Sequence, residues 1–435
     1  MPVAAGALLA RAMPVLAIPS RSMLEDLSRV HTTPEDGARD EDYWAAVARC
    51  YTVDRTIINL NNGGVAPSAA MVQEAHKRHL DYANTIPPPI ALWRQQEPRK
   101  EVVREQLARL CGVDPEEIAL TRNASESLQI CQLGIDLKRG DEILCCTQDY
   151  PRMLTAFRQR ERREGVVLKQ VEIPVPAEDP AAVVEIYRRA ITERTRMILV
   201  SHIVNITGQV MPVRALAEVA RSTNGGIPLI VDGAHALAHF EYSIPELGCD
   251  YYGASLHKWL GAPHGTGILF VKKDRIGGLW SLMASEEKKQ SDIRKFEEIG
   301  THPVAGFLAI ADALDFHLAI GAARKQARLV YLRDRWAKRL LALNTSATPG
   351  RVRMHTSLKT SAPMLSCGIA TFQLAGIDTS RLSEILWDRH SILTTAIKHE
   401  QFEGVRITPN VYTSLDQLDR FCGVVEQIVE HGLPA

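Results

Sequence analysis

The chain has 435 residues, of which 46% are hydrophobic and 23% are charged, so it is long enough to bury a large core. Because 51 Lys and Arg residues balance 51 Asp and Glu residues, no basic field is present to attract nucleic acid or an anionic membrane. The eight cysteines form no Cys-x-x-Cys pair and are scattered along the chain, which favours reduced thiols over a disulfide framework.

The first twenty residues, MPVAAGALLARAMPVLAIPS, are apolar and rich in small side chains, as a signal peptide is. However, no Lys or Arg precedes the apolar run, and Arg11 interrupts it. We therefore interpret this stretch as an N-terminal arm and expect a cytoplasmic protein, with export as the alternative. No later stretch approaches the roughly 18 uninterrupted apolar residues of a membrane span, so we expect no membrane partner.

Short apolar runs alternate with amphipathic segments between about residues 60 and 290. The prolines of TIPPP (85–89) predict a stiff loop, because each proline fixes φ and removes a donor. Helical segments such as 180–194 and 212–222 have the spacing of βαβ crossovers. Nearly continuous apolar runs predict strands buried on both faces at 142–146, 168–173, 197–202, 228–232, 250–255 and 266–272. The pattern is typical of an α/β fold with a mainly parallel sheet covered by helices.

The pattern changes after Pro303. Residues 304–343 predict one long helix, which we expect to act as the hinge to a smaller C-terminal α+β domain. That domain has predicted strands at 366–373 and 404–408 and predicted helices at 378–389 and 414–431. The expected organisation is an N-terminal arm and helical segment (1–54), a large domain (55–300), and the interdomain helix with the small domain (301–435).

Polar residues stand at the predicted carboxyl ends of the strands, where an open parallel sheet binds its ligands. Asp232 ends one strand, and Lys258 follows the next with Ser255 and His257 beside it and a glycine-rich run after it. A lysine flanked by a hydroxyl and an imidazole is suited to holding a phosphate or to forming a Schiff base.

A third strand end leads through residues 121–125 into a predicted helix, whose free N-terminal N–H groups would bind phosphate. A phosphate seat, a lysine amine and a buried carboxylate that keeps a pyridine nitrogen protonated are what pyridoxal phosphate requires of its protein. The sequence therefore predicts pyridoxal 5'-phosphate as the cofactor. A zinc site at His257 and His264 lacks a matching Cys or carboxylate pair, so we expect no metal.

Eight short motifs follow one another along the chain. They are NNGGVAPS (61–68), TRNASES (121–127), DYP (149–151), SHIVNITGQ (201–209), DGAHA (232–236), SLHKWLGAPHGTG (255–267), GTHP (300–303) and VRITPNVYTS (405–414). With them the chain resembles the class V aminotransferase family of fold-type I pyridoxal-phosphate enzymes, and within it the isopenicillin N epimerase-like branch. The resemblance covers about residues 55–430 and implies a mainly parallel, seven-stranded type of sheet in the large domain.

Carried over residue by residue, the resemblance implies that Lys258 holds the cofactor as a Schiff base and then shuttles the Cα proton. Asp232 would pair with the pyridine nitrogen, and His235 and Asn205 would approach the ring or its phenolic oxygen. Tyr150 would stack on the cofactor, although packing is an equal alternative for a tyrosine before proline. The remaining implied cofactor contacts come from Asn123, Ala124, Ser125, Ser255 and His257.

The resemblance also implies residues that bind the substrate and a residue that contacts a partner subunit. Thr301 resembles a threonine that contacts the phosphate across a dimer interface, which implies a homodimer with shared active sites. Arg406 resembles the arginine that clamps the substrate carboxylate in a bidentate fork, with an ion pair to Glu403 as the alternative. Asn62 and Trp93 are further candidates for substrate binding, and the alternative for Trp93 is packing at a helix start.

The implied substrate is an amino acid or small peptide whose Cα proton Lys258 removes. Return of the proton to the opposite face of Cα gives epimerisation, its delivery to the cofactor gives transamination, and loss of a β-substituent gives a lyase. The sequence does not reveal a second acid–base group, so transaminase and epimerase both stay open. A carbon–sulfur β-lyase is the alternative, and a non-catalytic binding protein of this fold is a remote one. Persulfide-forming desulfuration needs a nucleophilic cysteine on a mobile loop, and neither Cys367 nor Cys422 fits.

Overall fold

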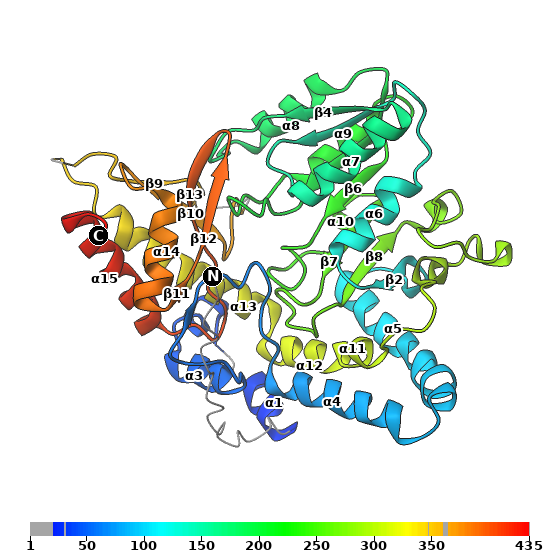
Figure 1. Cartoon of the computed structure of the whole chain (residues 1–435), viewed down its shortest axis with the longest axis horizontal. Coiled ribbons are helices and arrows are strands. Elements are labelled where there is room, and N and C mark those ends of the chain that lie inside the picture. Colours follow the sequence, from blue (N-terminus) through cyan, green and yellow to red (C-terminus); the bar gives the residue numbers. More distant parts are fainter. Residues whose placement is uncertain (1–20, 30–31, 347, 360–363, 435) are drawn as a thin grey trace, which may run out of the picture.

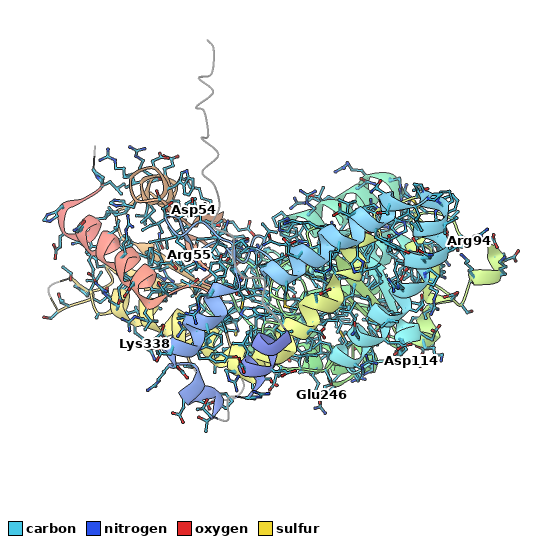
Figure 2. All side chains as sticks on the ribbon, turned by 90° about the horizontal axis from the view of Figure 1, so that it is seen from below. Asp54, Arg55, Arg94, Asp114, Glu246 and Lys338 are labelled. Atoms are coloured by element: carbon cyan, nitrogen blue, oxygen red, sulfur yellow. The ribbon has the colours of Figure 1, made fainter. Side chains whose placement is uncertain are left out.

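The structure is a computed structural model that describes residues 21–29, 32–346, 348–359 and 364–434 (Figure 1). The stretch interpreted above as an N-terminal arm, residues 1–20, lies outside the described residues, so the expected location in the cytoplasm stays a prediction. Charged side chains of both signs, such as Arg94, Glu246 and Lys338, extend from the surface (Figure 2).

A seven-stranded sheet forms the centre of the larger part of the molecule. Its order is β2 (Ile118–Thr121), β8 (Gly267–Val271), β7 (Tyr251–Ser255), β6 (Leu229–Asp232), β5 (Thr195–Ser201), β3 (Glu142–Cys146) and β4 (Val167–Val171). Strand β8 is antiparallel to both of its neighbours, and the remaining neighbours are parallel. The predicted α/β fold with a mainly parallel sheet is confirmed, and the six predicted strands end within two residues of their expected positions.

Helices cover both faces of this sheet (Figure 1). On one face lie α6 (Ala124–Gly134) and α7 (Pro151–Glu164). On the other lie α5 (Lys100–Cys111), α8 (Pro180–Ala190), α9 (Val213–Ser222) and α12 (Ile310–Ile320). Cys145 and Cys146, adjacent in β3, belong to the two different cores, because successive side chains of a strand point to opposite faces. Burial on both faces explains why these strands are apolar throughout.

The smaller C-terminal part is an antiparallel sheet packed on helices. The sheet order is β12 (Thr395–His399), β13 (Phe402–Ile407), β10 (Ala370–Leu374) and β9 (Val352–Met354). The helices are α13 (Ala322–Leu341), α14 (Thr379–His390) and α15 (Leu415–His431). Trp336, Phe372 and Phe421 are buried together, and Phe421 meets each of the other two rings edge to face, so this sheet has a core of its own.

A two-residue ladder that the sequence does not predict links the beginning of the chain to this C-terminal part. Strand β1 (Ile58–Asn59) pairs in parallel with β11 (Ile392–Leu393), and Asn61 forms a bridge with Thr408. Ile58 and Leu60 are buried in the C-terminal core. The loop that begins NNGG is therefore held next to β13.

The prediction of one long helix over 304–343 is wrong. The segment forms α11 (Ala305–Leu308), α12 and α13, with Gly321 between the last two at φ +85°. Glycine takes this conformation without strain, and the chain bends there by 75°. Along α13, Leu329 packs in the core of the large sheet and Leu332 in the C-terminal core, so α13 joins the two parts.

Among the described residues, no single helix is long and apolar enough to cross a membrane, and the pair Ala305–Ile320 with Ala322–Leu341 meets that test only when joined across its bend. The N-terminal helices are attached to α13 by the buried Arg328, which donates to the Ala38 carbonyl and pairs with Glu41. The other helices are α1 (Arg21–Ser28), α2 (Pro34–Gly37), α3 (Glu41–Arg49), α4 (Ala70–Thr85), η1 (Pro89–Gln96), η2 (Glu97–Arg99), η3 (Pro115–Glu117), α10 (Ile244–Leu247), η4 (Lys273–Arg275), η5 (Glu287–Lys289) and η6 (Ile293–Glu297).

We predict that Gly267→Ala destabilises the large sheet, whereas Gly423→Ala does not. A Cβ at Gly267 would lie 2.7 Å from the Cα of Asn123 and 2.8 Å from the Ala254 oxygen, and both are backbone atoms. The substitution is expected to lower the free energy of unfolding by about 2 kcal/mol, the cost of overpacking. Gly423 lies within α15 with nothing within 4 Å, so alanine there should stabilise by about 0.5–1 kcal/mol. Urea unfolding of both variants is the measurement, and equal stabilities would contradict the prediction.

Candidate active site

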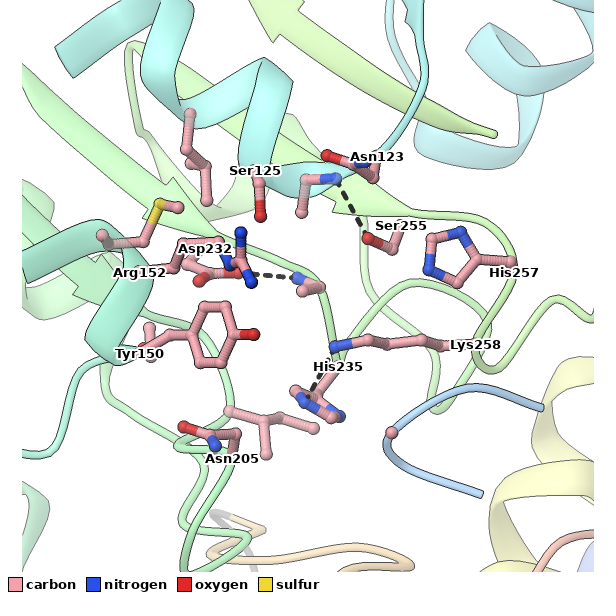
Figure 3. Close-up of a pocket in the computed structure, with 17 residues that line it drawn as sticks. Asn123, Ser125, Tyr150, Arg152, Asn205, Asp232, His235, Ser255, His257 and Lys258 are labelled. Carbon is pink, nitrogen blue, oxygen red and sulfur yellow. Dashed lines mark hydrogen bonds between the residues drawn. The ribbon is translucent and has the colours of Figure 1, made fainter. Parts of the chain in front are cut away.

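A cavity of about 300 Å³ opens at the carboxyl ends of the central strands (Figure 3). Its lining comes from the segments that follow β2, β3, β5, β6 and β7, with Gly64 added from the N-terminal loop. Ten of the fourteen site residues predicted from the sequence line it, namely Asn123, Ala124, Ser125, Tyr150, Asn205, Asp232, His235, Ser255, His257 and Lys258. Residues from distant parts of the chain thus meet in one place.

Asp232 and Lys258 face the same cavity. Asp232 is the last residue of β6 and accepts a hydrogen bond from the Ala234 N–H at 3.0 Å. Burial raises the pKa of its carboxyl group, and the charge of Lys258 opposes that rise. Burial likewise lowers the pKa of Lys258 to about 8, Asp232 opposes this, and the charge of Arg406 adds to it. The amine and the carboxylate are therefore electrostatically coupled.

His235 lies against the lysine amine. Its Nε2 is 3.1 Å from the Nζ of Lys258, and its Nδ1 is buried without a hydrogen-bond partner in the described chain. Burial, together with the charges of Lys258 and Arg406, holds the pKa of His235 well below its ordinary value. The imidazole is therefore neutral at neutral pH and can accept a hydrogen bond from the ammonium form of Lys258.

The first turn of α6 forms the upper wall of the cavity in Figure 3. Asn123 caps this helix by accepting from the Glu126 N–H at 2.9 Å, and the Ala124 N–H donates to Ser255 Oγ at 3.0 Å. The hydroxyl of Ser125 points into the cavity (Figure 3). Gly267 allows β8 to approach the backbone of Asn123 closely. A helix N-terminus with hydroxyl groups beside it is suited to a phosphate.

Arg406, on β13, does not line the cavity itself but is hydrogen-bonded to a residue that does. It donates from Nη1 to the Asn205 carbonyl and from Nη2 to Asn61 Oδ1, both at 2.9 Å. Burial lowers the pKa of Arg406 to about 10, and its Nε has no hydrogen-bond partner among the described residues. The ion pair with Glu403 that the sequence left open is not formed, because the guanidinium is turned towards Asn205 and Asn61 instead.

Three predicted residues lie away from the cavity. Asn62 is buried, and its amide is occupied by the carbonyls of Asn59 and Thr408 and by the hydroxyl of Tyr412, so its side chain stabilises the loop rather than facing a substrate. Trp93 on η1 has 59% of its surface exposed. Thr301 is also exposed, outside the cavity of its own chain. The homodimer implied through Thr301 stays a prediction.

Sequence reasoning missed two residues of the DYPR segment. Asp149 is buried and accepts hydrogen bonds from the Cys146 N–H and from both the N–H and the hydroxyl of Ser201. Burial raises its pKa to about 6, with repulsion from Asp232 adding to the rise. Arg152, in the first turn of α7, lines the cavity. An acid at a strand end and a cation directly after a helix-starting proline were the available signals.

The donor set fits pyridoxal phosphate. A carboxylate stands at the end of β6 and an amine at the loop after β7, while a helix N-terminus with Ser125 and Ser255 supplies donors for a phosphate. Two polar atoms at the site, Asn205 Oδ1 and His235 Nδ1, are buried without partners among the described residues. Buried polar atoms of this kind are rare in folded proteins unless a ligand or water satisfies them.

Comparisons with solved structures support the fold. A cysteine desulfurase from Thermococcus onnurineus in its apo form superposes with a TM-score of 0.75 at 22% identity, covering 92% of this chain and 99% of that one. A C-DES variant with glycine covalently linked to its pyridoxal-phosphate cofactor gives a TM-score of 0.75 at 21% identity, covering 85% and 96% of the two chains. The fold is that of fold-type I pyridoxal-phosphate enzymes.

Sequence comparisons identify the family. The chain is 30% identical over 405 residues to an isopenicillin N epimerase of Streptomyces clavuligerus, which covers 88% of this chain and 98% of that protein. It is 24% identical over 353 residues to a probable cysteine desulfurase of Pseudomonas aeruginosa, covering 76% and 82% of the two chains. The model of the family "Aminotransferase class-V" matches residues 63–398. The chain therefore belongs to the class V aminotransferase family, and it is an enzyme whose cofactor is pyridoxal 5'-phosphate.

Proposed function

We propose that this enzyme removes the Cα proton of an amino acid or small peptide, with Lys258 as the base and Arg406 as the clamp for the substrate carboxylate. The reaction class is epimerisation or transamination. The observation that carries this proposal is the position of the Lys258 amine, which shares a cavity with Asp232 and lies 3.1 Å from the neutral imidazole of His235.

Pyridoxal phosphate, when bound, supplies an electron sink that stabilises negative charge developing at Cα. In this proposal Asp232 keeps the pyridine nitrogen protonated, because a buried carboxylate attracts a cation strongly. The N-terminus of α6, Ser125 and Ser255 would hold the phosphate. Nδ1 of His235 and Oδ1 of Asn205, which are buried without partners among the described residues, would find hydrogen-bond partners on the cofactor. Each of these groups orients the cofactor without itself moving a proton.

Lys258 is suited to carry the proton. A base works best when its pKa is near the operating pH, and burial lowers the pKa of Lys258 to about 8. His235 can accept a hydrogen bond from the ammonium form without competing for the proton, because its own pKa is held low. Lys258 can thus take up a proton as the amine and release it as the ammonium ion while its side chain stays in the cavity.

Arg406 is suited to the substrate carboxylate. Two of its nitrogens are held by Asn205 and Asn61, which fixes the plane of the guanidinium, and its Nε lacks a partner in the described chain. A buried cation without a counter-ion gains from any carboxylate that reaches it. Because Arg406 donates to the carbonyl of Asn205, which lines the same cavity as Lys258, a carboxylate held by Arg406 would bring the attached Cα towards the amine.

The cysteines argue against a persulfide route. All eight are buried free thiols within the described residues, and none lines the cavity. Burial raises the pKa of Cys367 to about 12, so its nucleophilic thiolate is scarce. Of the relatives, the isopenicillin N epimerase aligns over nearly its whole length. A carbon–sulfur β-lyase is the alternative function, since elimination uses the same lysine and needs no thiol of the protein.

The cofactor attachment gives the first test. After incubation with pyridoxal phosphate and reduction with borohydride, mass spectrometry should find the cofactor on Lys258 in the wild type and not in Lys258→Ala. Lys273→Ala, which removes an exposed lysine, should leave the label at position 258 unchanged. In deuterium oxide the wild type should exchange the Cα hydrogen of a responding amino acid, and Lys258→Ala should exchange it at least about 100-fold more slowly. A protein that binds no cofactor at Lys258 contradicts the proposed function.

The lowered pKa of Lys258 predicts a pH-dependent cost to stability. The pKa is about 8 in the folded protein and 10.5 for a free lysine, so the unfolded chain binds this proton more tightly. The cost is complete below about pH 8 and disappears as the pH rises to 10.5. In the cofactor-free protein Lys258→Met should therefore raise the free energy of unfolding by about 2 kcal/mol at pH 7. Urea unfolding should show a smaller gain at pH 10.5, and a gain independent of pH would count against a buried ammonium.

Replacement of Arg406 should separate substrate binding from cofactor binding. Loss of a charge-assisted contact costs about 1.5–3 kcal/mol, so Arg406→Gln should weaken the binding of an amino acid roughly 10- to 100-fold. The binding is read from the change in cofactor absorbance during titration with the amino acid. Arg353→Gln on β9 removes an exposed arginine and serves as the matched control. If Arg406→Gln leaves this affinity unchanged, another residue holds the carboxylate.

A further inference from the structure

Tyr150 and Lys258 reach the cavity from opposite sides of Asp232. The strand order places β6, which ends at Asp232, between β7 on one side and β5 and β3 on the other. Lys258 follows β7, whereas Tyr150 follows β3. Figure 3 shows the phenolic oxygen of Tyr150 pointing into the cavity, on the side from which the Lys258 amine does not come.

A substrate carboxylate bound by Arg406 would lie near both of these side chains. The Nη1 of Arg406 donates at 2.9 Å to the carbonyl of Asn205, which lines the same cavity as Tyr150 and Lys258. A substrate carboxylate held by Arg406 would bring the attached Cα between the two groups. The phenol and the amine would then approach that carbon from different directions.

The hydroxyl of Tyr150 is available for chemistry, while its backbone is fixed. Tyr150 is 39% exposed, and within the described residues its hydroxyl has no hydrogen-bond partner. The hydroxyls of Tyr242 and Tyr252, by contrast, are bonded to each other at 2.5 Å. The Tyr150 backbone begins α7 and follows Asp149, which three hydrogen bonds hold in place. A free acid on a rigid support can meet a substrate in a defined geometry.

The other polar groups described on that side of the cavity are less suited to exchange a proton with a substrate. The Ser201 hydroxyl lines the cavity but donates its proton to Asp149. His235 and His257 stand on the Lys258 side, the former in contact with the amine. Arg152 lies on the Tyr150 side, but a guanidinium stays protonated and cannot act as a base. Asp149 on the same side is buried, and its oxygens are occupied by Cys146 and Ser201. Among the described lining residues this leaves the phenol.

We propose that Tyr150 is the second acid–base group, acting on the face of Cα opposite Lys258, and that the reaction of this enzyme is epimerisation at Cα. The proposal rests on the function proposed above, with Lys258 as the base, and it names the step that follows proton removal.

The proton transfers balance. The Lys258 amine takes the Cα proton and becomes an ammonium ion, and the Tyr150 hydroxyl gives its proton to the other face and becomes a phenolate. One C–H bond breaks and one forms, so nothing is oxidised or reduced and no group leaves. The reverse reaction uses the same two groups in exchanged roles, and water returns the proton from the ammonium ion to the phenolate between turnovers.

Tyr150→Phe tests the proposal, because it removes the hydroxyl and keeps the ring. The L forms of the protein amino acids, and separately the D forms, are incubated in deuterium oxide, and Cα deuterium and the opposite enantiomer are measured by mass spectrometry after chiral separation. The wild type should exchange both enantiomers and interconvert them. The variant should still exchange the enantiomer whose Cα hydrogen faces Lys258. Its rate of exchange for the other enantiomer, and its rate of interconversion, should each fall by at least about 100-fold.

Two measurements separate this role from a structural one. The dissociation constant of pyridoxal phosphate and the midpoint of thermal unfolding should both be unchanged in Tyr150→Phe, since no protein contact of the hydroxyl is lost. Tyr82→Phe is the matched control, because Tyr82 is also 39% exposed and lies outside the cavity. The Tyr82 hydroxyl donates to Gln95, so this variant serves as a control for catalysis and not for stability, and it should exchange and interconvert the enantiomers as the wild type does.

The other possible results distinguish a failure of the role of Tyr150 from a failure of the proposed function. Equal loss of exchange for both enantiomers in Tyr150→Phe would overturn the proposal, and so would keto-acid formation without an opposite enantiomer in the wild type. In both cases exchange by the wild type and the label on Lys258 would leave the proposed function standing. Absence of exchange and of the label in the wild type would instead overturn the proposed function, and the role of Tyr150 with it.

Discussion

The site depends on one electrostatic constraint, which is the burial of the Lys258 amine in a cavity where, among the described residues, Asp232 is the neighbour of opposite charge. Removing an ammonium ion from water is costly, and the carboxylate of Asp232 offsets only part of that cost. Arg406 increases it by repulsion. The result is a pKa of about 8, which brings an ordinarily unreactive lysine close to the range where a base works at neutral pH.

The large sheet and the C-terminal sheet position different residues of the site. The large sheet fixes the amine, the carboxylate and the helix N-terminus, because their segments all follow strands that end at the same edge. The C-terminal sheet supplies Arg406, and the short ladder between β1 and β11 brings Asn61 to its guanidinium. A movement of one part against the other would therefore disturb the hydrogen bond from Arg406 to Asn205 and change the position of the guanidinium relative to Lys258.

The parts of this structure that the sequence predicts are those with local physical causes. The buried strands are apolar because helices cover both faces, and Asp232 and Lys258 stand out because charged residues are rare in such surroundings. Contacts between distant segments could not be foreseen, such as those of Arg406 with residues 201 and 345 positions away. The bend at Gly321 was missed because one glycine costs a helix only about 1 kcal/mol, which a periodic pattern hides. Asp149 was missed because its hydrogen bonds link the end of β3 to the end of β5, and the sequence does not show which strand ends lie side by side.

The chain shares its fold with cysteine desulfurases and most of its length with epimerases, so the fold alone does not select the reaction. Epimerisation, unlike transamination or elimination, requires a group that meets Cα on the side away from the lysine. In this chain the cysteines lie in the cores, and that side is formed by the exposed first turn of α7. Tyr150 and Arg152 are exposed, so substitutions there are expected to cost less stability than substitutions in the buried strands. Reaction specificity is therefore expected to reside in this turn, and the chemistry of proton removal in the buried residues behind it.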